Sequence, residues 1–189
     1  MVGQYRNLYL FLRHGHSLAN EQNIIISDPG TGTTGYGLSR LGNEQLSGLL
    51  DSWQWPEPTQ ILCSDFLRTE QTAALVSKKF DVPVAKDSRL RERRFGQFEG
   101  LSAQQYQVVW DYDARDPAHT YGDVESLESV AARMTQCIED LEQAYCDETI
   151  LLVSHGDPIQ IIVTALQRRP LSQHRDHLTL RPAGVVIHH

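Results

Sequence analysis

The chain has 189 residues, of which 40% are hydrophobic and 22% are charged, a size and composition typical of one globular domain. The formal net charge of -7, without any run of lysines or arginines, argues against a nucleic-acid partner, and no apolar stretch is long enough to cross a membrane. Three cysteines without CxxC spacing argue against a disulfide framework or a structural zinc site. We therefore predict a single cytoplasmic domain over residues 1–189.

Short apolar runs that predict buried β-strands alternate along the chain with amphipathic segments that predict helices. In chain order, the predicted strands are 8–12, 61–63, 150–153 and 185–187, and the predicted helices are 39–53, 65–80, 126–145 and 157–166. This alternation favours the α/β class. The expected architecture is a three-layer sandwich, a mainly parallel central sheet with helices on both faces.

Two segments show neither helical nor strand periodicity. Residues 21–37 and 100–123 are rich in Gly, Pro, Asp and Ser. We predict long loops there, which on an α/β scaffold commonly border the functional site.

Polar residues follow three of the predicted strands at the point where each strand ends. Arg13 and His14 follow the first strand. Arg68 follows the second after a short turn, and His155 follows the third. Because ligands of open α/β sheets bind at the carboxyl ends of the strands, we expect these four residues to share one site.

The chemistry of these residue types suits a phosphate ester. Guanidinium groups form paired hydrogen bonds with phosphate oxygens, and a neutral imidazole can attack phosphorus. The neighbouring positive charges disfavour the imidazolium, so His14 should remain unprotonated at neutral pH. Glu92 is the best candidate for the acid that protonates the leaving alcohol. Asp157 is the rival acid, although its position favours a capping role at the start of the last helix.

Five motifs in this order resemble those of the histidine phosphatase superfamily, in its phosphoglycerate-mutase-like branch. They are Leu12-Arg13-His14-Gly15-His16-Ser17 with Asn20, Ser64 to Ala73 around Arg68, Glu92 with Gly96 and Glu99-Gly100, Glu125-Ser126-Leu127, and Ser154-His155-Gly156. The motifs span essentially the whole chain, and five in the same order are far more specific than any one alone.

The resemblance implies a catalytic role for each matching residue. His14 matches the nucleophile that forms a phosphohistidine, and Glu92 matches the proton donor. The groups that hold the phosphoryl oxygens are matched by Arg13, Arg68 and His155. The resemblance implies a small phosphorylated substrate, and neither a metal nor an organic cofactor.

The same resemblance bears on three further positions. Asn20 matches a residue that lines the phosphate pocket. Arg93 resembles an arginine that either contacts the substrate or supports the site from behind. His16 stands where the family commonly has glutamate or glutamine, so its role is not given by the resemblance.

Two other patterns in the sequence do not support a binding site. Gly30 to Gly35 matches GxGxxG, but a dinucleotide fingerprint opens a helix directly, whereas the helical pattern begins only near Ser39. A metal site formed by His14, His16 and His155 is disfavoured because the nearby arginines oppose a divalent cation.

The interval between two of the motifs bears on whether the phosphoryl group is hydrolysed or transferred to a second substrate hydroxyl. Glycolytic mutases of the family carry a longer insertion between the proton-donor glutamate and the Glu-Ser-Leu motif, whereas Glu125 here lies only 33 residues after Glu92. A shorter segment over the pocket leaves the pocket open to water, which favours a phosphatase that hydrolyses phosphate monoesters. The alternatives are a phosphoglycerate-type mutase and a non-catalytic phospholigand-binding protein of the same fold. The sequence specifies neither the physiological substrate nor the oligomeric state.

Overall fold

The computed structural model describes residues 5–176 and 179–188, which are arranged around a central sheet of strand order β3-β2-β4-β1-β5. The strands are β1 (Leu8–Arg13), β2 (Gln60–Cys63), β3 (Val84–Lys86), β4 (Thr149–Ser154) and β5 (Val185–His188). Neighbouring strands pair in parallel except β5, which is antiparallel to β1. The mainly parallel sheet is therefore confirmed. The single domain over 1–189 stays a prediction, and residues 1–4, 177–178 and 189 of that range lie outside the described residues.

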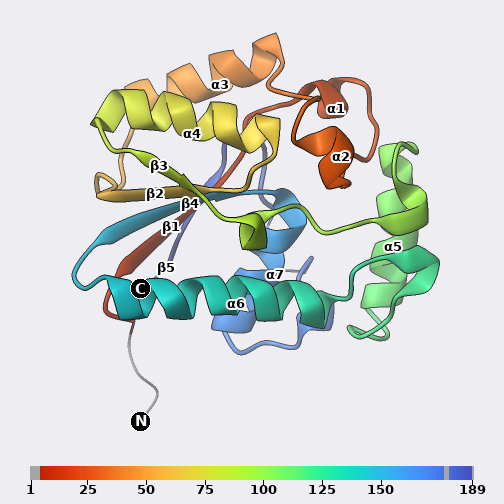
Figure 1. The fold of residues 1–189 in the computed structure, drawn as a ribbon. Helices are drawn as coiled ribbons and strands as arrows, with labels where there is room; N and C mark the ends of the chain where they lie inside the picture. Colours follow the sequence, from red (N-terminus) through yellow and green to blue (C-terminus); the bar gives the residue numbers. More distant parts are fainter. Residues whose placement is uncertain (1–4, 177–178, 189) are drawn as a thin grey trace.

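Helices cover both faces of this sheet, as predicted. The helices are α1 (Leu18–Glu21), α2 (Pro29–Gly32), α3 (Arg40–Asp51), α4 (Leu67–Phe80), α5 (Tyr106–Asp113), α6 (Leu127–Ala144) and α7 (Gly156–Leu166). Figure 1 shows α3 and α4 on one face and α6 and α7 on the other, with α5 beyond the carboxyl ends of the strands. Among the residues that the structure describes, no helix has the length and apolar character needed to cross a bilayer.

The alternation of side chains along β1 explains why its sequence is a continuous apolar run. Tyr9 and Phe11 point into the cluster formed with α6 and α7, whereas Leu10 and Leu12 point into the cluster formed with α3 and α4. All four side chains are fully buried. A strand with helices on both faces has no side exposed to solvent, so both sets of alternating positions must be apolar.

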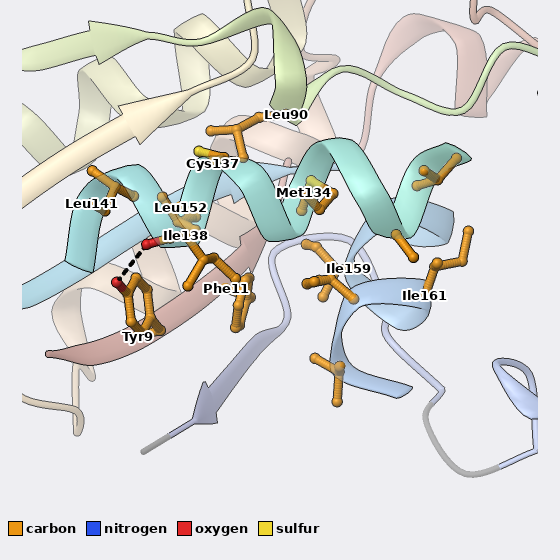
Figure 2. Packing of buried hydrophobic residues seen from close by; sticks show 14 of the residues in the cluster. Tyr9, Phe11, Leu90, Met134, Cys137, Ile138, Leu141, Leu152, Ile159 and Ile161 are labelled. Atoms are coloured by element: carbon orange, nitrogen blue, oxygen red, sulfur yellow. Dashed lines mark hydrogen bonds between the residues drawn. The ribbon is translucent and has the colours of Figure 1, made fainter. Parts of the chain in front are cut away.

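Helix α6 is anchored on the sheet by an apolar stripe with helical spacing. Ser126 caps its start by accepting a hydrogen bond from the backbone N–H of Ser129. Met134, Ile138 and Leu141 pack onto β1 and α7, as Figure 2 shows. Each fully buried side chain of this kind contributes about 1.5–3 kcal/mol to folding.

The prediction of loops over 21–37 and 100–123 is wrong in part, because these segments contain α2 and α5. The buried positions of α5 are Val109 and Asp113, four residues apart. A buried aspartate breaks the apolar pattern that identifies a helix in a sequence, so its periodicity is hidden. Both segments nevertheless border the pocket described below, which confirms the predicted position.

Candidate active site

The carboxyl ends of β1, β2 and β4 bring the four predicted residues together. Arg13 ends β1 and His14 follows it, while His155 follows β4 and is the N-cap of α7. Arg68 lies in the first turn of α4, just after β2. The rings of His14 and His155 have centroids 5.2 Å apart, and the Nε atom of Arg68 donates to the Nε2 atom of His14 at 3.1 Å. The structure thus places all four around one point.

Arg13, His14 and Arg68 line a cavity of about 150 Å³, and His155 contacts His14 without being one of the lining residues. The cavity is lined by Arg13, His14, Ser17, Ala19, Asn20, Ile24, Ile26, Arg68, Glu92, Tyr106, Trp110, Gly156, Asp157 and Arg175. The lining combines charged groups from the strand ends with apolar side chains from the two segments that border the site. Such a combination suits a small ligand with one strongly polar end.

The hydrogen bonds of His14 determine which ring nitrogen can react. Its Nδ1 atom lies 2.7 Å from the carbonyl oxygen of Gly15. A carbonyl only accepts hydrogen bonds, so Nδ1 carries the proton and Nε2 presents its lone pair. Burial, together with the charges of Arg68 and Arg13, lowers the pKa of His14 well below its ordinary value. His14 is therefore neutral, with Nε2 available as a nucleophile.

Three buried nitrogen atoms around the cavity make no hydrogen bond within residues 5–176 and 179–188. They are Nε of Arg13, Nη1 of Arg68 and Nδ1 of His155. Buried polar groups are normally paired, and unpaired ones at one place indicate a site that a ligand completes. The other nitrogen of His155, Nε2, contacts the hydroxyl of Ser64 at 2.9 Å. When that hydroxyl donates, Nδ1 carries the proton, and all three nitrogens are donors suited to an oxyanion.

Glu92 has the position and the pKa expected of a proton donor. Its Oε2 atom lies 3.9 Å from both Arg68 Nη2 and His155 Nδ1, and its Oε1 atom accepts from the backbone N–H of Arg93 at 2.9 Å. Burial raises the pKa of Glu92 to about 7, despite the opposing charge of Arg68. A carboxyl group with this pKa can give and take a proton near neutral pH.

Asp157, the rival acid, differs from Glu92 in its partners. Burial alone would raise its pKa, but the charges of His174, Arg93 and Arg175 hold the pKa of Asp157 below its ordinary value. An ionised carboxylate cannot donate a proton, so the site favours Glu92 as the acid. The predicted capping role of Asp157 is wrong, because α7 begins at Gly156 and no side chain caps it.

Asn20 and His16 lie close together in the sequence but occupy different environments. Asn20 lines the cavity from α1, and its Oδ1 atom accepts from the backbone N–H and the hydroxyl of Ser17, both at 3.0 Å. Its amide nitrogen is thereby left as a donor for the cavity. The Nδ1 atom of His16 instead contacts the hydroxyl of Ser39 at 2.8 Å, which ties the segment after β1 to the start of α3.

Comparison with known proteins identifies the family. Residues 9–189 match the histidine phosphatase superfamily, branch 1. The chain belongs to this superfamily. The motif resemblance seen in the sequence is thereby confirmed.

Individual relatives of this histidine phosphatase include both phosphatases and a mutase. The glucosyl-3-phosphoglycerate phosphatase of Mycolicibacterium vanbaalenii is 28% identical over 176 residues, which cover 86% of this chain and 75% of that protein. The 2,3-bisphosphoglycerate-dependent phosphoglycerate mutase of Methylobacterium radiotolerans is 25% identical over 176 residues, which cover 84% of this chain and 78% of that protein.

Solved structures with the same fold include a mycobacterial glucosyl-3-phosphoglycerate phosphatase complexed with VO3. It has a TM-score of 0.81 and 25% sequence identity, over 95% of this chain and 90% of that chain. The agreement confirms the α/β sandwich predicted from the sequence.

Arg93 does not line the cavity of this histidine phosphatase, which corrects the prediction that it binds substrate. Its side chain is fully buried, and its two terminal nitrogens donate to the carboxylate of Asp113 at 2.7 and 2.8 Å. Its Nε atom donates to the carbonyl oxygen of Glu125 at 2.7 Å. Of the two alternatives, the supporting role therefore fits the structure: Arg93 joins α5 to the segment that carries Glu92.

Removing the carboxylate of Asp113 is expected to lower the free energy of unfolding by about 3–5 kcal/mol, because the buried charge of Arg93 would lose its two hydrogen bonds to Asp113 and be left with the carboxylate of Asp157, 3.5 Å away. Urea denaturation of Asp113→Ala measures this loss. Asp111→Ala on the exposed side of the same helix, where Asp111 accepts a hydrogen bond from the side chain of Gln107, should change the value by less than about 0.5 kcal/mol. Equal stability of the two variants would contradict the supporting role of this ion pair.

Among the side chains that line the cavity, the sequence did not identify Tyr106, Trp110 or Arg175. Tyr106 and Trp110 stack with centroids 5.4 Å apart. Their spacing of four residues was the signal available, since it places two aromatic rings on the same side of a helix. Nothing in the sequence around Arg175 points to the site, because its position depends on how the segment after α7 folds back.

Proposed function

We propose that this histidine phosphatase hydrolyses phosphate monoesters of small molecules through a phosphohistidine formed on Nε2 of His14. The observation that supports the proposal is the environment of that atom: an unprotonated nitrogen beside three buried nitrogens that have no hydrogen-bond partner among the described residues. Donors fixed in advance around a buried point stabilise the charge that develops on phosphoryl oxygens in the transition state.

In the first step, Nε2 of His14 attacks phosphorus while the bond from phosphorus to the ester oxygen breaks. Arg13, Arg68 and His155 donate hydrogen bonds to the phosphoryl oxygens. The Nε atom of Arg68, which donates to His14 Nε2 before the reaction, exchanges that acceptor for a phosphoryl oxygen. Glu92 gives its proton to the leaving alcohol and becomes a carboxylate.

In the second step, water attacks the phosphorus of the phosphohistidine. The Glu92 carboxylate takes a proton from this water, the bond between phosphorus and Nε2 breaks, and inorganic phosphate leaves. His14 is neutral again, still with its proton on Nδ1, and Glu92 is again an acid. Each group returns to its starting state, so the cycle needs no further reactant.

A mutase is the second candidate, because one relative of similar identity is a phosphoglycerate mutase. The two reactions share the first step and differ in whether water or a substrate hydroxyl receives the phosphoryl group. Incubation with 3-phosphoglycerate separates them. We expect release of inorganic phosphate, and isomer exchange without free phosphate would contradict hydrolysis.

The third alternative, a protein that binds phosphorylated ligands without turnover, predicts no hydrolysis of p-nitrophenyl phosphate above the background rate. We propose catalysis because nucleophile, phosphoryl-binding groups and acid lie together. We also propose the cytoplasm as the site of action, in keeping with Cys63, Cys137 and Cys146, none of which is in a disulfide.

A further inference from the structure

One cation at the cavity has no part in the mechanism above. Within the part of the chain that the structure describes, the arginines lining the cavity are Arg13, Arg68 and Arg175. The first two are the groups proposed to hold the phosphoryl oxygens. Arg175 comes from a different part of the fold, the segment that follows the short helical turn Leu171–Gln173 after α7.

The guanidinium of Arg175 is held in place by both α5 and α7. Its Cζ atom lies 3.7 Å from the centroid of the Trp110 ring, a stacking arrangement that favours a cation. Its Nη1 atom donates to Asp157 Oδ1 at 3.3 Å and also contacts the side-chain oxygen of Gln160. The other oxygen of Asp157 accepts from the indole N–H of Trp110 at 3.3 Å, so one carboxylate positions both members of the stack.

These contacts leave one edge of the guanidinium available. Only Nη1 donates hydrogen bonds, whereas Nε and Nη2 make none among residues 5–176 and 179–188. The side chain is 35% exposed, so a ligand in the cavity can reach it. Nε and Nη2 form a parallel pair of N–H groups, and that geometry matches the two oxygens of a carboxylate or a phosphate.

Asp157 does not cancel the positive charge of Arg175 by itself. The same carboxylate also lies 3.5 Å from Nη1 of Arg93, so its negative charge is shared between two guanidinium groups. Arg93 is itself paired with Asp113, so the positive charge that an anion meets comes from the cavity lining, where Arg13, Arg68 and Arg175 outnumber the carboxyl groups of Glu92 and Asp157. Because the guanidinium is already fixed by its stacking, little conformational entropy is lost when the anion binds.

We propose that Arg175 binds a second anionic group of the substrate, a carboxylate or a second phosphate carried by the leaving alcohol. The inference rests on the proposed phosphatase function and narrows its substrate class. The preferred substrates are phosphorylated acids and bisphosphates, while esters of uncharged alcohols are hydrolysed less efficiently. Arg175 is then a residue that determines specificity, apart from the groups that carry out the reaction.

The test compares substrates that differ only in the second anion. Glycerol 3-phosphate has none, 3-phosphoglycerate has a carboxylate in place of one alcohol group, and glycerol 1,3-bisphosphate has a second phosphate. The measured quantity is the ratio of kcat/KM for each anionic substrate to kcat/KM for glycerol 3-phosphate. In Arg175→Met this ratio should fall by about 10- to 100-fold, the effect of losing a charge-assisted hydrogen-bonded pair. The substrate with the larger fall identifies the preferred anion.

Two further variants separate recognition from packing. Arg175→Lys keeps the charge but loses the paired N–H groups, so its ratio should lie between those of the wild type and Arg175→Met. Arg169→Met removes an exposed arginine between α7 and the turn Leu171–Gln173 that does not line the cavity, and it should leave the ratio unchanged.

The outcomes distinguish this inference from the proposed function. If Arg175→Met lowers kcat/KM equally for all three substrates, Arg175 only supports Trp110 and the specificity proposal is overturned, while the phosphatase function stands. A wild-type enzyme without preference for either anionic substrate overturns it as well. If the wild type hydrolyses none of them, the proposed function fails. Calorimetric binding of the same ligands to the same variants then decides whether Arg175 selects the second anion.

Discussion

Replacing His14 with alanine is expected to lower kcat for phosphate release on the order of 10⁴-fold or more, because no other group can form the covalent intermediate. The neighbouring histidine, His155, is not placed to act as the nucleophile instead of His14. The Nε2 atom of His155 is engaged with Ser64, and its ring centroid lies 5.2 Å from that of His14. Steady-state hydrolysis of p-nitrophenyl phosphate by wild type and His14→Ala measures the loss.

The intermediate itself provides a second measurement. Wild-type enzyme mixed with a ³²P-labelled substrate and quenched in alkali should retain label, and acid should then release it. This is the behaviour of a phosphoramidate bond, which is stable in alkali and labile in acid. His14→Ala should retain none. His16→Ala is the matched control, because the ring of His16 contacts Ser39 and does not line the cavity, so this variant should still be labelled. Label on His14→Ala would show that another residue is the nucleophile.

The residues at the ends of the strands were predictable from the sequence for a topological reason. A parallel sheet brings the carboxyl ends of its strands to one edge, so residues that follow different strands meet whatever their separation in the chain. His14 and His155 are far apart in sequence, yet β1 and β4 are adjacent, with Arg13 paired with Ser154. The apolar runs therefore predict where the strands lie, and the ends of the strands predict where the site lies.

The wall of the cavity formed by α5 could not be predicted in the same way. The buried face of α5 includes Asp113, which is tolerated because Arg93, from a distant part of the chain, and His119 both pair with it. A charged residue at a core position interrupts the apolar periodicity, so the segment is predicted as a loop unless the partner of that residue is known. The position of Arg175 could not be predicted either, because its contacts with Trp110 and Asp157 form only when α5 and α7 pack together.

Glu92 is an intermediate case, in which the sequence indicates the residue and the structure gives its chemistry. The motif around it predicts a proton donor, but an exposed glutamate has a pKa near its ordinary value and is ionised at neutral pH. Burial is what raises the pKa of Glu92 to about 7. The supporting contact from the backbone N–H of Arg93 then fixes the carboxyl group within 3.9 Å of His155.

Replacing Glu92 with glutamine is expected to lower kcat for an alkyl phosphate by about 10²- to 10⁴-fold, the contribution typical of a general acid. The loss should be much smaller for p-nitrophenyl phosphate in the step that releases the alcohol, because p-nitrophenolate leaves without a proton. Single-turnover measurements of nitrophenolate release isolate this step from hydrolysis of the phosphohistidine. An equal loss for both leaving groups would mean that Glu92 acts by some route other than proton donation.

The pH dependence gives the sign of the effect and separates Glu92 from Asp157. The acid form of Glu92 predominates below its pKa of about 7, so the single-turnover rate with an alkyl phosphate should fall as pH rises through 7. This decline should be absent in Glu92→Gln. It should persist in Asp157→Asn, because the pKa of Asp157 lies below its ordinary value and the group is already ionised across this range, but it should move to lower pH, because the charge of Asp157 helps to raise the pKa of Glu92. Loss of the decline in Asp157→Asn, with its retention in Glu92→Gln, would assign the proton to Asp157 instead. The physical basis of the choice is that two buried carboxyl groups of one cavity differ in how many cations surround them.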